Sequence, residues 1–161
     1  HPDKDMDGLT TVNAGRLFSG KDGLFGGTPR AVMAILKHYG ISVEGKHAVI
    51  IGRSNVIGKP VAMMLMQKNA TVTICHSRTK NLSEITQQAD ILVTAVGKAG
   101  CVTADMVKPG AIVLYVGINR IHGETGGDVD YENVPGGVGS VTTTMIIESI
   151  VKAGEHAAGI K

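Results

Sequence analysis

The sequence has no tryptophan, and only 3% of its residues are aromatic. A core built around large rings is therefore excluded, and aliphatic side chains and methionine must fill it. There are only two cysteines, Cys75 and Cys101, and their spacing fits neither a metal site nor a redox motif. A disulfide-rich scaffold is therefore excluded. No apolar run is long enough to cross a membrane, and a net charge of +2 is too small to indicate nucleic-acid binding.

Length and composition favour one ordinary folded domain. The chain has 161 residues, of which 43% are hydrophobic, and its 22 glycines indicate many tight turns. No signal peptide is visible, and two cysteines without a metal or redox spacing indicate a reducing compartment, so we expect a cytoplasmic location. The chain begins with His1 rather than Met, which leaves an organellar location open.

Four short apolar runs predict β-strands buried on both faces, as in a parallel sheet. They cover residues 46–51, 70–75, 91–96 and 111–116. Helical patterns lie between and around these runs, at residues 28–39, 60–68, 82–89, 103–107 and 142–153. Strands that alternate with helices in this way predict an α/β fold with a Rossmann-like, mostly parallel sheet and helices on both faces. We expect residues 1–161 to form this single domain.

The strongest local motif runs from Gly52 to Pro60, with the sequence GRSNVIGKP. It follows a predicted strand and opens a predicted helix, which is the setting of a dinucleotide-binding turn. Gly52 permits the sharp turn, Gly58 lets the helix approach the sheet, and the helix N-terminus offers N–H groups to a pyrophosphate. Ser54 occupies the position of the usual middle glycine, so its hydroxyl is a candidate phosphate donor. An ordinary glycine-rich turn is the alternative interpretation. Because ligands bind where the strand order reverses, Gly52 is expected at that central point.

The end of the second predicted strand favours NADP over NAD. An NAD site usually carries an acid there, which binds the ribose hydroxyls. Here the strand is followed by His76, Ser77 and Arg78, without an acid. Serine and arginine suit a 2′-phosphate, and Arg53 could reach the same group from the first turn. A solvated basic loop is the alternative.

Several segments together resemble one family, the methylenetetrahydrofolate dehydrogenase/cyclohydrolases, in its C-terminal NAD(P)-binding half. They are PDKDMDGLTTVNAGRL, GRSNVIGKP, NATVTICHSRT, ADILVTAVGKAG, VKPGAIVLYVGIN, GDVD and PGGVG. The resemblance runs almost from end to end. It implies oxidation of 5,10-methylenetetrahydrofolate with NADP, followed by hydrolysis to 10-formyltetrahydrofolate. It also implies a two-domain, homodimeric enzyme that binds folate between its domains.

The resemblance also implies roles for individual residues. Arg53 and Ser77 correspond to contacts with the 2′-phosphate, and Asp7 to a folate-binding aspartate that can accept two hydrogen bonds from the pterin. The remaining correspondences are Ser54 and Ile57 on the pyrophosphate turn, Val96 and Gly97 beside the ribose, Ile118 and Asn119 near the nicotinamide, and Gly136, Gly137 and Val138 in the loop over it. Without the resemblance, Asp5 and Asp7 would be taken as solvated turn residues.

The chain departs from the family pattern in ways that concern catalysis. No tyrosine has a lysine four positions later, so the family's Tyr-x-x-x-Lys pair, and with it any catalytic residue, is absent from this sequence. Two alternatives therefore remain beside an enzyme domain: a cofactor-binding fragment without catalysis, and an NADP-sensing interaction module. The local departures are Gly26-Gly27, which we expect to loosen their loop, Tyr115 in place of an aspartate, Ser140 in place of a proline, and a shortened segment between Val134 and Pro135.

Overall fold

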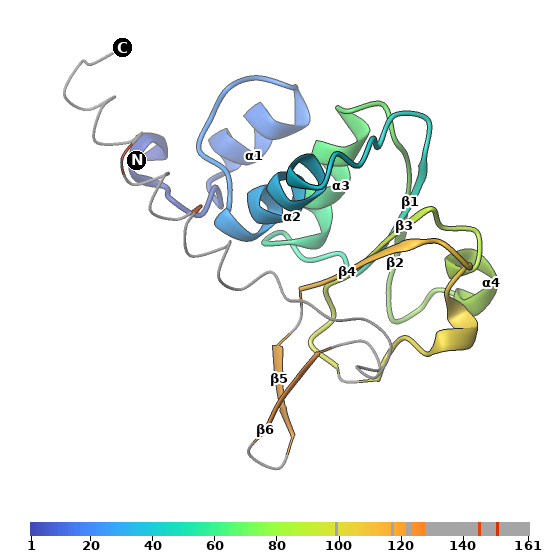
Figure 1. Cartoon of the computed structure of the whole chain (residues 1–161). Helices are drawn as coiled ribbons and strands as arrows, with labels where there is room; N and C mark the ends of the chain where they lie inside the picture. Colours follow the sequence, from blue (N-terminus) through green and yellow to red (C-terminus); the bar gives the residue numbers. More distant parts are fainter. Residues whose placement is uncertain (99, 117, 122–123, 128–144, 146–150, 152–161) are drawn as a thin grey trace.

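The fold is a four-stranded parallel sheet with helices on both faces (Figure 1). The structure is a computed structural model, which describes residues 1–98, 100–116, 118–121, 124–127, 145 and 151. The strands lie in the order β2-β1-β3-β4, and every neighbouring pair is parallel. Their bounds are β1 His47–Ile51, β2 Thr71–Cys75, β3 Ile91–Thr94 and β4 Ile112–Tyr115. The predicted α/β fold is confirmed.

The helices and a separate hairpin complete the described elements. They are η1 Pro2–Lys4, α1 Thr11–Phe18, α2 Gly27–His38, α3 Gly58–Met66, α4 Leu82–Thr86 and η2 Ala104–Met106, with the strands β5 Ile118–Ile121 and β6 Glu124–Gly127. The last two strands pair antiparallel in their own sheet, and the sequence patterns had not indicated this hairpin. In Figure 1 it projects away from the parallel sheet.

Two hydrophobic clusters flank the sheet, because alternate residues of a strand point to opposite faces. Ala48 and Ile50 of β1 join the cluster that includes residues of α2 and α3. Val49 and Ile51 join the other cluster, against which Leu82 and Ile85 of α4 pack. The sequence is nearly apolar along β1 and β3 because both of their faces are covered.

The expectation that all four strands are buried on both faces is wrong for the two outer strands of the described sheet. In β4 only Leu114 is buried, and β2 is the clearer case. This strand lies at the edge of the sheet, and of its five residues only Cys75 is fully buried. The threonines at positions 71 and 73 are compatible with an edge strand. A run of β-branched residues does not by itself show whether a strand is central or at the edge.

The predicted helices are present with shifted bounds. α2 ends at His38, and Gly40 caps it as expected. Gly40 has a φ of +64° and its N–H donates to the Lys37 carbonyl, while the Ile41 N–H donates to the Leu36 carbonyl, as in a Schellman motif. α3 begins two residues before Pro60. Residues 103–107 contain a 3-10 turn instead of an α-helix, and α4 is shorter than predicted. Most of the predicted helix at 142–153 lies outside the described residues.

Helix α1 was not predicted, although its cap has a readable signal. Thr10 accepts a hydrogen bond from the N–H of Asn13 through its side chain, as a helix N-cap does. The helix is only eight residues long, and of these only Asn13 and Leu17 are buried, so it is shorter than the stretch over which apolar periodicity predicts a helix. The Gln67 side chain, which follows α3, donates a hydrogen bond to the carbonyl of Leu17 and ties the two helices together.

Candidate functional site

The candidate site lies at the carboxyl ends of the parallel strands, where the chain changes direction across the sheet. From β1 the chain passes through α3 to β2 on one side, and then through α4 to β3 on the other side of β1. β1 is therefore the strand at which the order reverses, and Gly52 follows it directly. Ligands bind at this point in open α/β sheets, so the expected position of Gly52 is confirmed.

Backbone hydrogen bonds join the loops that leave these strands. The N–H of Gly52 donates to the carbonyl of Cys75 at 2.8 Å, and the N–H of Ala95 donates to the carbonyl of Ile51 at 2.8 Å. The loops that begin at residues 52, 76 and 95 therefore start side by side at one edge of the sheet.

Both predicted glycines are required by the backbone of the first loop. Gly52 has a φ of +128°, and a Cβ atom there would stand 2.6 Å from the Ala95 carbonyl oxygen. A Cβ atom on Gly58 would overlap with the carbonyl oxygen of Gly52. Their absent side chains let the start of α3 lie against the end of β1, which is the cradle that a pyrophosphate needs.

Ser54 has a different local role from the one its position suggested. Its Oγ accepts hydrogen bonds from the N–H groups of Ile57, at 3.0 Å, and Gly58, at 3.4 Å. It therefore caps the start of α3. A serine hydroxyl that accepts two hydrogen bonds still has its own hydrogen to donate. Ser54 is exposed, so that hydrogen is available to a phosphate.

The basic and hydroxyl side chains of the two neighbouring loops are exposed. Arg53, Ser77 and Arg78 all follow the paired strand ends Ile51 and Cys75. The second loop is held in shape by its own hydrogen bonds, because the N–H of His76 donates to Thr79 Oγ1 at 2.8 Å. Neither residues 52–59 nor residues 76–80 include an acid. The exposed hydrogen-bond donors of these loops can bind a phosphate. Neither segment has a carboxylate that could accept hydrogen bonds from a pair of ribose hydroxyls.

The other predicted cofactor contacts are only partly within the described structure. Val96 and Gly97 follow β3 and are exposed, and Gly97 has a φ of +63°. Ile118 and Asn119 begin β5, where their backbones pair with residues 127 and 126. Gly136, Gly137 and Val138 lie outside the described residues, as do Ser140 and the junction of Val134 with Pro135.

Cys75 and His76 have structural roles. The Cys75 side chain is fully buried in the second cluster, and burial raises the pKa of its thiol, although a hydrogen bond with Thr79 acts in the opposite direction. A thiol of raised pKa is a poor nucleophile. His76 accepts a hydrogen bond from the N–H of Arg78 through Nδ1. Tyr115 packs against the same cluster as Cys75.

The two acids of the DMDG segment, Asp5 and Asp7, lie in different environments. Asp7 is exposed, and within the described part of the chain its side chain has no hydrogen bond or ion pair. Asp5 instead accepts three hydrogen bonds, so the interpretation of Asp5 as a solvated turn residue is wrong. Gly26 and Gly27 are buried, and a Cβ atom on Gly26 would stand 3.1 Å from the Asp7 carbonyl oxygen. This close packing replaces the loose loop that was expected.

The described residues hold neither a metal-binding cluster nor a membrane-spanning helix. They include no group of three or more His, Cys, Asp or Glu side chains that could hold a metal ion. Among these same residues, no helix has the length and apolar character needed to cross a membrane.

Comparison with known proteins identifies a family. The sequence model of the family described as "Tetrahydrofolate dehydrogenase/cyclohydrolase, NAD(P)-binding domain" matches residues 26–158. A curated relative, the bifunctional protein FolD of Herpetosiphon aurantiacus, is 50% identical over 98% of this chain and 59% of its own length. The chain therefore spans about three fifths of that relative.

Solved structures agree. A bifunctional FolD methylenetetrahydrofolate dehydrogenase/cyclohydrolase from Campylobacter jejuni has a TM-score of 0.93 at 45% identity, over 98% of this chain and 60% of its own. The Trypanosoma brucei enzyme, solved with NADP cofactor and an inhibitor, has a TM-score of 0.89 at 33% identity, over 98% and 60%. The glycine cradle, its place in the sheet and these matches agree: the chain belongs to the NAD(P)-binding domain family of the tetrahydrofolate dehydrogenase/cyclohydrolases.

Proposed function

We propose that this chain binds NADP as the cofactor-binding part of an enzyme that oxidises 5,10-methylenetetrahydrofolate to the methenyl form and hydrolyses that product to 10-formyltetrahydrofolate. The observation that carries the proposal is the cradle formed by Gly52 and Gly58 where the strand order reverses. The names of the relatives, and the NADP in the Trypanosoma brucei structure, support it.

The phosphates would be held by the first two loops. The pyrophosphate would accept from the Ser54 hydroxyl at the start of α3, where the helix dipole favours negative charge. The 2′-phosphate would lie between Arg53 and the pair Ser77 and Arg78, on loops that begin at hydrogen-bonded strand ends. Arginine binds phosphate through two N–H groups at once, so this contact selects NADP over NAD.

The remaining contacts would orient the ring. Val96 and Gly97 would lie beside the nicotinamide-side ribose, and Ile118 and Asn119 would lie near the ring. The loop of Gly136, Gly137 and Val138 would cover it. Bound NADP supplies the acceptor for the hydride from the substrate. The residues of this chain would position the nicotinamide ring and exclude water from it, and the rate of hydride transfer depends on such positioning.

Asp7 would supply one wall of the folate site. Its exposed carboxylate can accept two hydrogen bonds from the aminopyrimidine edge of a pterin. Because the family's Tyr-x-x-x-Lys pair is absent from this sequence, the acid/base groups would come from a separate N-terminal domain. Residues 1–161 would form one NAD(P)-binding domain. We further propose a homodimeric enzyme in the cytoplasm, which light scattering and fractionation would test.

Calorimetric titration of the chain with NADP and with NAD tests the proposal. We expect NADP to bind more tightly by a factor of about ten or more, because a charged contact with the 2′-phosphate contributes roughly 1.5–3 kcal/mol. A chain that binds neither dinucleotide would contradict the proposed function. Equal affinities would contradict the selection by Arg53 and its neighbours while leaving dinucleotide binding in place. The alternative of an NADP-sensing module would be favoured by a partner that binds only when NADP is present.

A further inference from the structure

The carboxylate of Asp5 closes the chain around the turn that carries Asp7. Its Oδ1 accepts from the N–H of Leu9 at 2.9 Å, and its Oδ2 accepts from the N–H of Thr10 at 2.7 Å. The carbonyl of Asp5 also accepts from the N–H of Gly8 at 3.1 Å. Three of the next five backbone N–H groups are therefore bound to one residue. Asp7 lies inside this closed segment, with its own side chain exposed.

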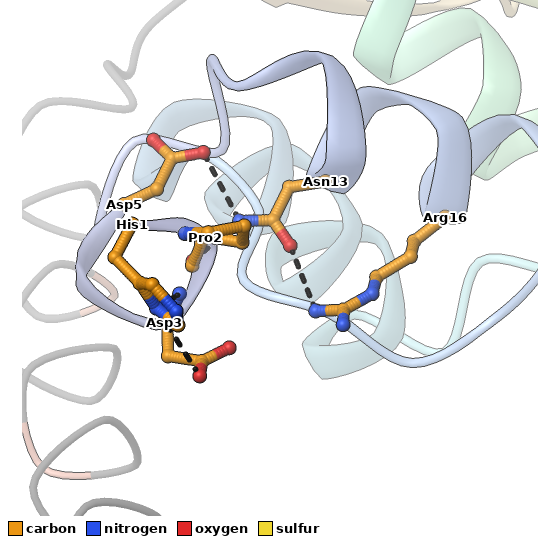
Figure 2. A network of polar contacts seen from close by, with 6 residues as sticks. All are labelled: His1, Pro2, Asp3, Asp5, Asn13 and Arg16. Carbon is orange, nitrogen blue, oxygen red and sulfur yellow. Dashed lines mark hydrogen bonds and ion pairs between the residues drawn. The ribbon is translucent and has the colours of Figure 1, made fainter.

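The buried side-chain amide of Asn13 also binds the carboxylate of Asp5. Asn13 is fully buried in α1, and its Nδ2 donates to Asp5 Oδ2 at 3.0 Å and to the Pro2 carbonyl at 2.8 Å (Figure 2). Its Oδ1 accepts from Arg16 at 3.3 Å. Every polar atom of this buried side chain is thus used, which fixes its orientation. Burial alone would raise the pKa of Asp5, but the hydrogen bonds from Thr10, Asn13 and Leu9 outweigh it and lower the pKa to about 2.

The turn is also packed against the chain that enters α2. A Cβ atom on Gly8, whose φ is +65°, would stand 2.7 Å from the Leu24 carbonyl oxygen and 2.8 Å from Phe25 Cα. One residue later, Gly26 lies against the Asp7 carbonyl oxygen. The backbone on both sides of Asp7 is therefore fixed against the start of α2, which packs on α3.

We propose that Asp5 and Asn13 are positioning residues for the folate site: they hold the Asp7 turn so that its carboxylate stands ready for the aminopyrimidine edge of a pterin. This proposal rests on the proposed function, because it assigns ligand contact to Asp7. Asp5 and Asn13 touch no ligand. The two acids of the DMDG segment thus have separate tasks, one as an internal acceptor and the other as a ligand group.

Amide hydrogen exchange tests the first half of the proposal without any ligand. The variant Asp5→Asn keeps the size of the side chain but directs an NH2 group at a donor, either Thr10 N–H or Asn13 Nδ2. We expect exchange to accelerate at residues 6–10 in this variant and in Asn13→Ala. The matched control is Asp22→Asn, which removes an exposed acid of the same charge. Unchanged exchange at residues 6–10 in Asp5→Asn would overturn the proposal.

Folic acid binding tests the second half. Titration followed by NMR, with NADP present, compares Asp5→Asn, Asp7→Asn and the double variant. We expect each single change to weaken folic acid about tenfold, since a charge-assisted hydrogen bond is lost or misplaced. The double variant should bind no more weakly than Asp7→Asn, because Asp5 acts through Asp7.

The outcomes separate the two proposals. Additive losses of affinity in the double variant would show that Asp5 affects binding independently of Asp7, and would overturn the positioning role. An Asp7→Asn variant whose affinity for folic acid is unchanged would overturn the assignment of Asp7. NADP affinity should stay unchanged in every variant. Its absence in the wild-type chain would instead contradict the proposed function.

Discussion

The start of α3 lies so close to the end of β1 that a Cβ atom on Gly58 would overlap with the carbonyl oxygen of Gly52. This contact joins the two glycines of the cofactor loop directly, and it fixes where the helix N-terminus stands relative to the strand ends.

We expect Gly58→Ala to lower both the free energy of unfolding and the affinity for NADP. An added methyl group must displace backbone, and overpacking of this kind costs about 1–3 kcal/mol. Gly15→Ala is the control, because Gly15 lies in α1 with nothing within 4 Å of its Cβ position. The control should gain roughly 0.5–1 kcal/mol from helix propensity. Urea unfolding measures the change in the free energy of unfolding for both variants, and two changes of the same sign would contradict the role of the contact.

We expect Arg53→Ala to weaken NADP binding by about 1.5–3 kcal/mol and to leave NAD binding nearly unchanged, because only NADP carries the 2′-phosphate. Lys68→Ala removes the same charge from an exposed position beyond the other end of α3. Calorimetry on the two variants separates a local contact from a general effect of net charge. Equal losses in both would refute the contact.

Acid should remove a stabilising interaction at Asp90. A hydrogen bond from Lys108, at 2.6 Å, and one from the N–H of His47 lower the pKa of Asp90 from 3.8 to about 2. Because the pKa is lower in the folded state, the stabilisation is complete above the unfolded value and disappears as pH falls through the folded one.

Unfolding of the wild type and of Asp90→Asn, measured from about pH 6 to about pH 2, should give a difference that narrows between about pH 4 and about pH 2. A difference that is constant over this range would contradict the assignment. Lys68→Ala, which removes a lysine without such a partner among the described residues, should show no such narrowing.

The isolated 161-residue chain should bind NADP without measurable oxidation of methylenetetrahydrofolate. Asp7 would supply only one wall of the proposed folate site, and loss of correct positioning removes roughly 7–11 kcal/mol of barrier lowering. The cyclohydrolase step should fail as well, because no general acid or base can be named here. NADPH absorbance, with and without a separately produced folate-binding domain of a relative, is the measurement. Turnover by the chain alone, with its intact mass verified, would mean that the catalytic residues are misassigned.

The sheet and the glycine loop could be predicted because their sequence signals are local. The continuous apolar residues of β1 and β3 indicate burial on two faces. Gly52 and Gly58 occupy positions where the backbone leaves no room for a side chain. The edge position of β2 depends on strand order, which one strand's sequence does not encode.

The role of Asp5 depends on contacts that sequence patterns do not contain. Asn13 lies eight residues further along the chain, on a helix of only eight residues. The partners of its buried side chain, the Pro2 carbonyl and the Asp5 carboxylate, both precede the helix. Asp5 and Asp7 therefore look alike in the sequence, and only the fold separates them.

The cap that Ser54 places on α3 has a consequence for how the cofactor binds. The N–H groups of Ile57 and Gly58 already have an acceptor before any phosphate arrives. The loop is thus ordered in advance, and binding requires no ordering of its backbone. Association should then be fast, and differences in affinity between dinucleotides should appear almost entirely in the rate at which they leave.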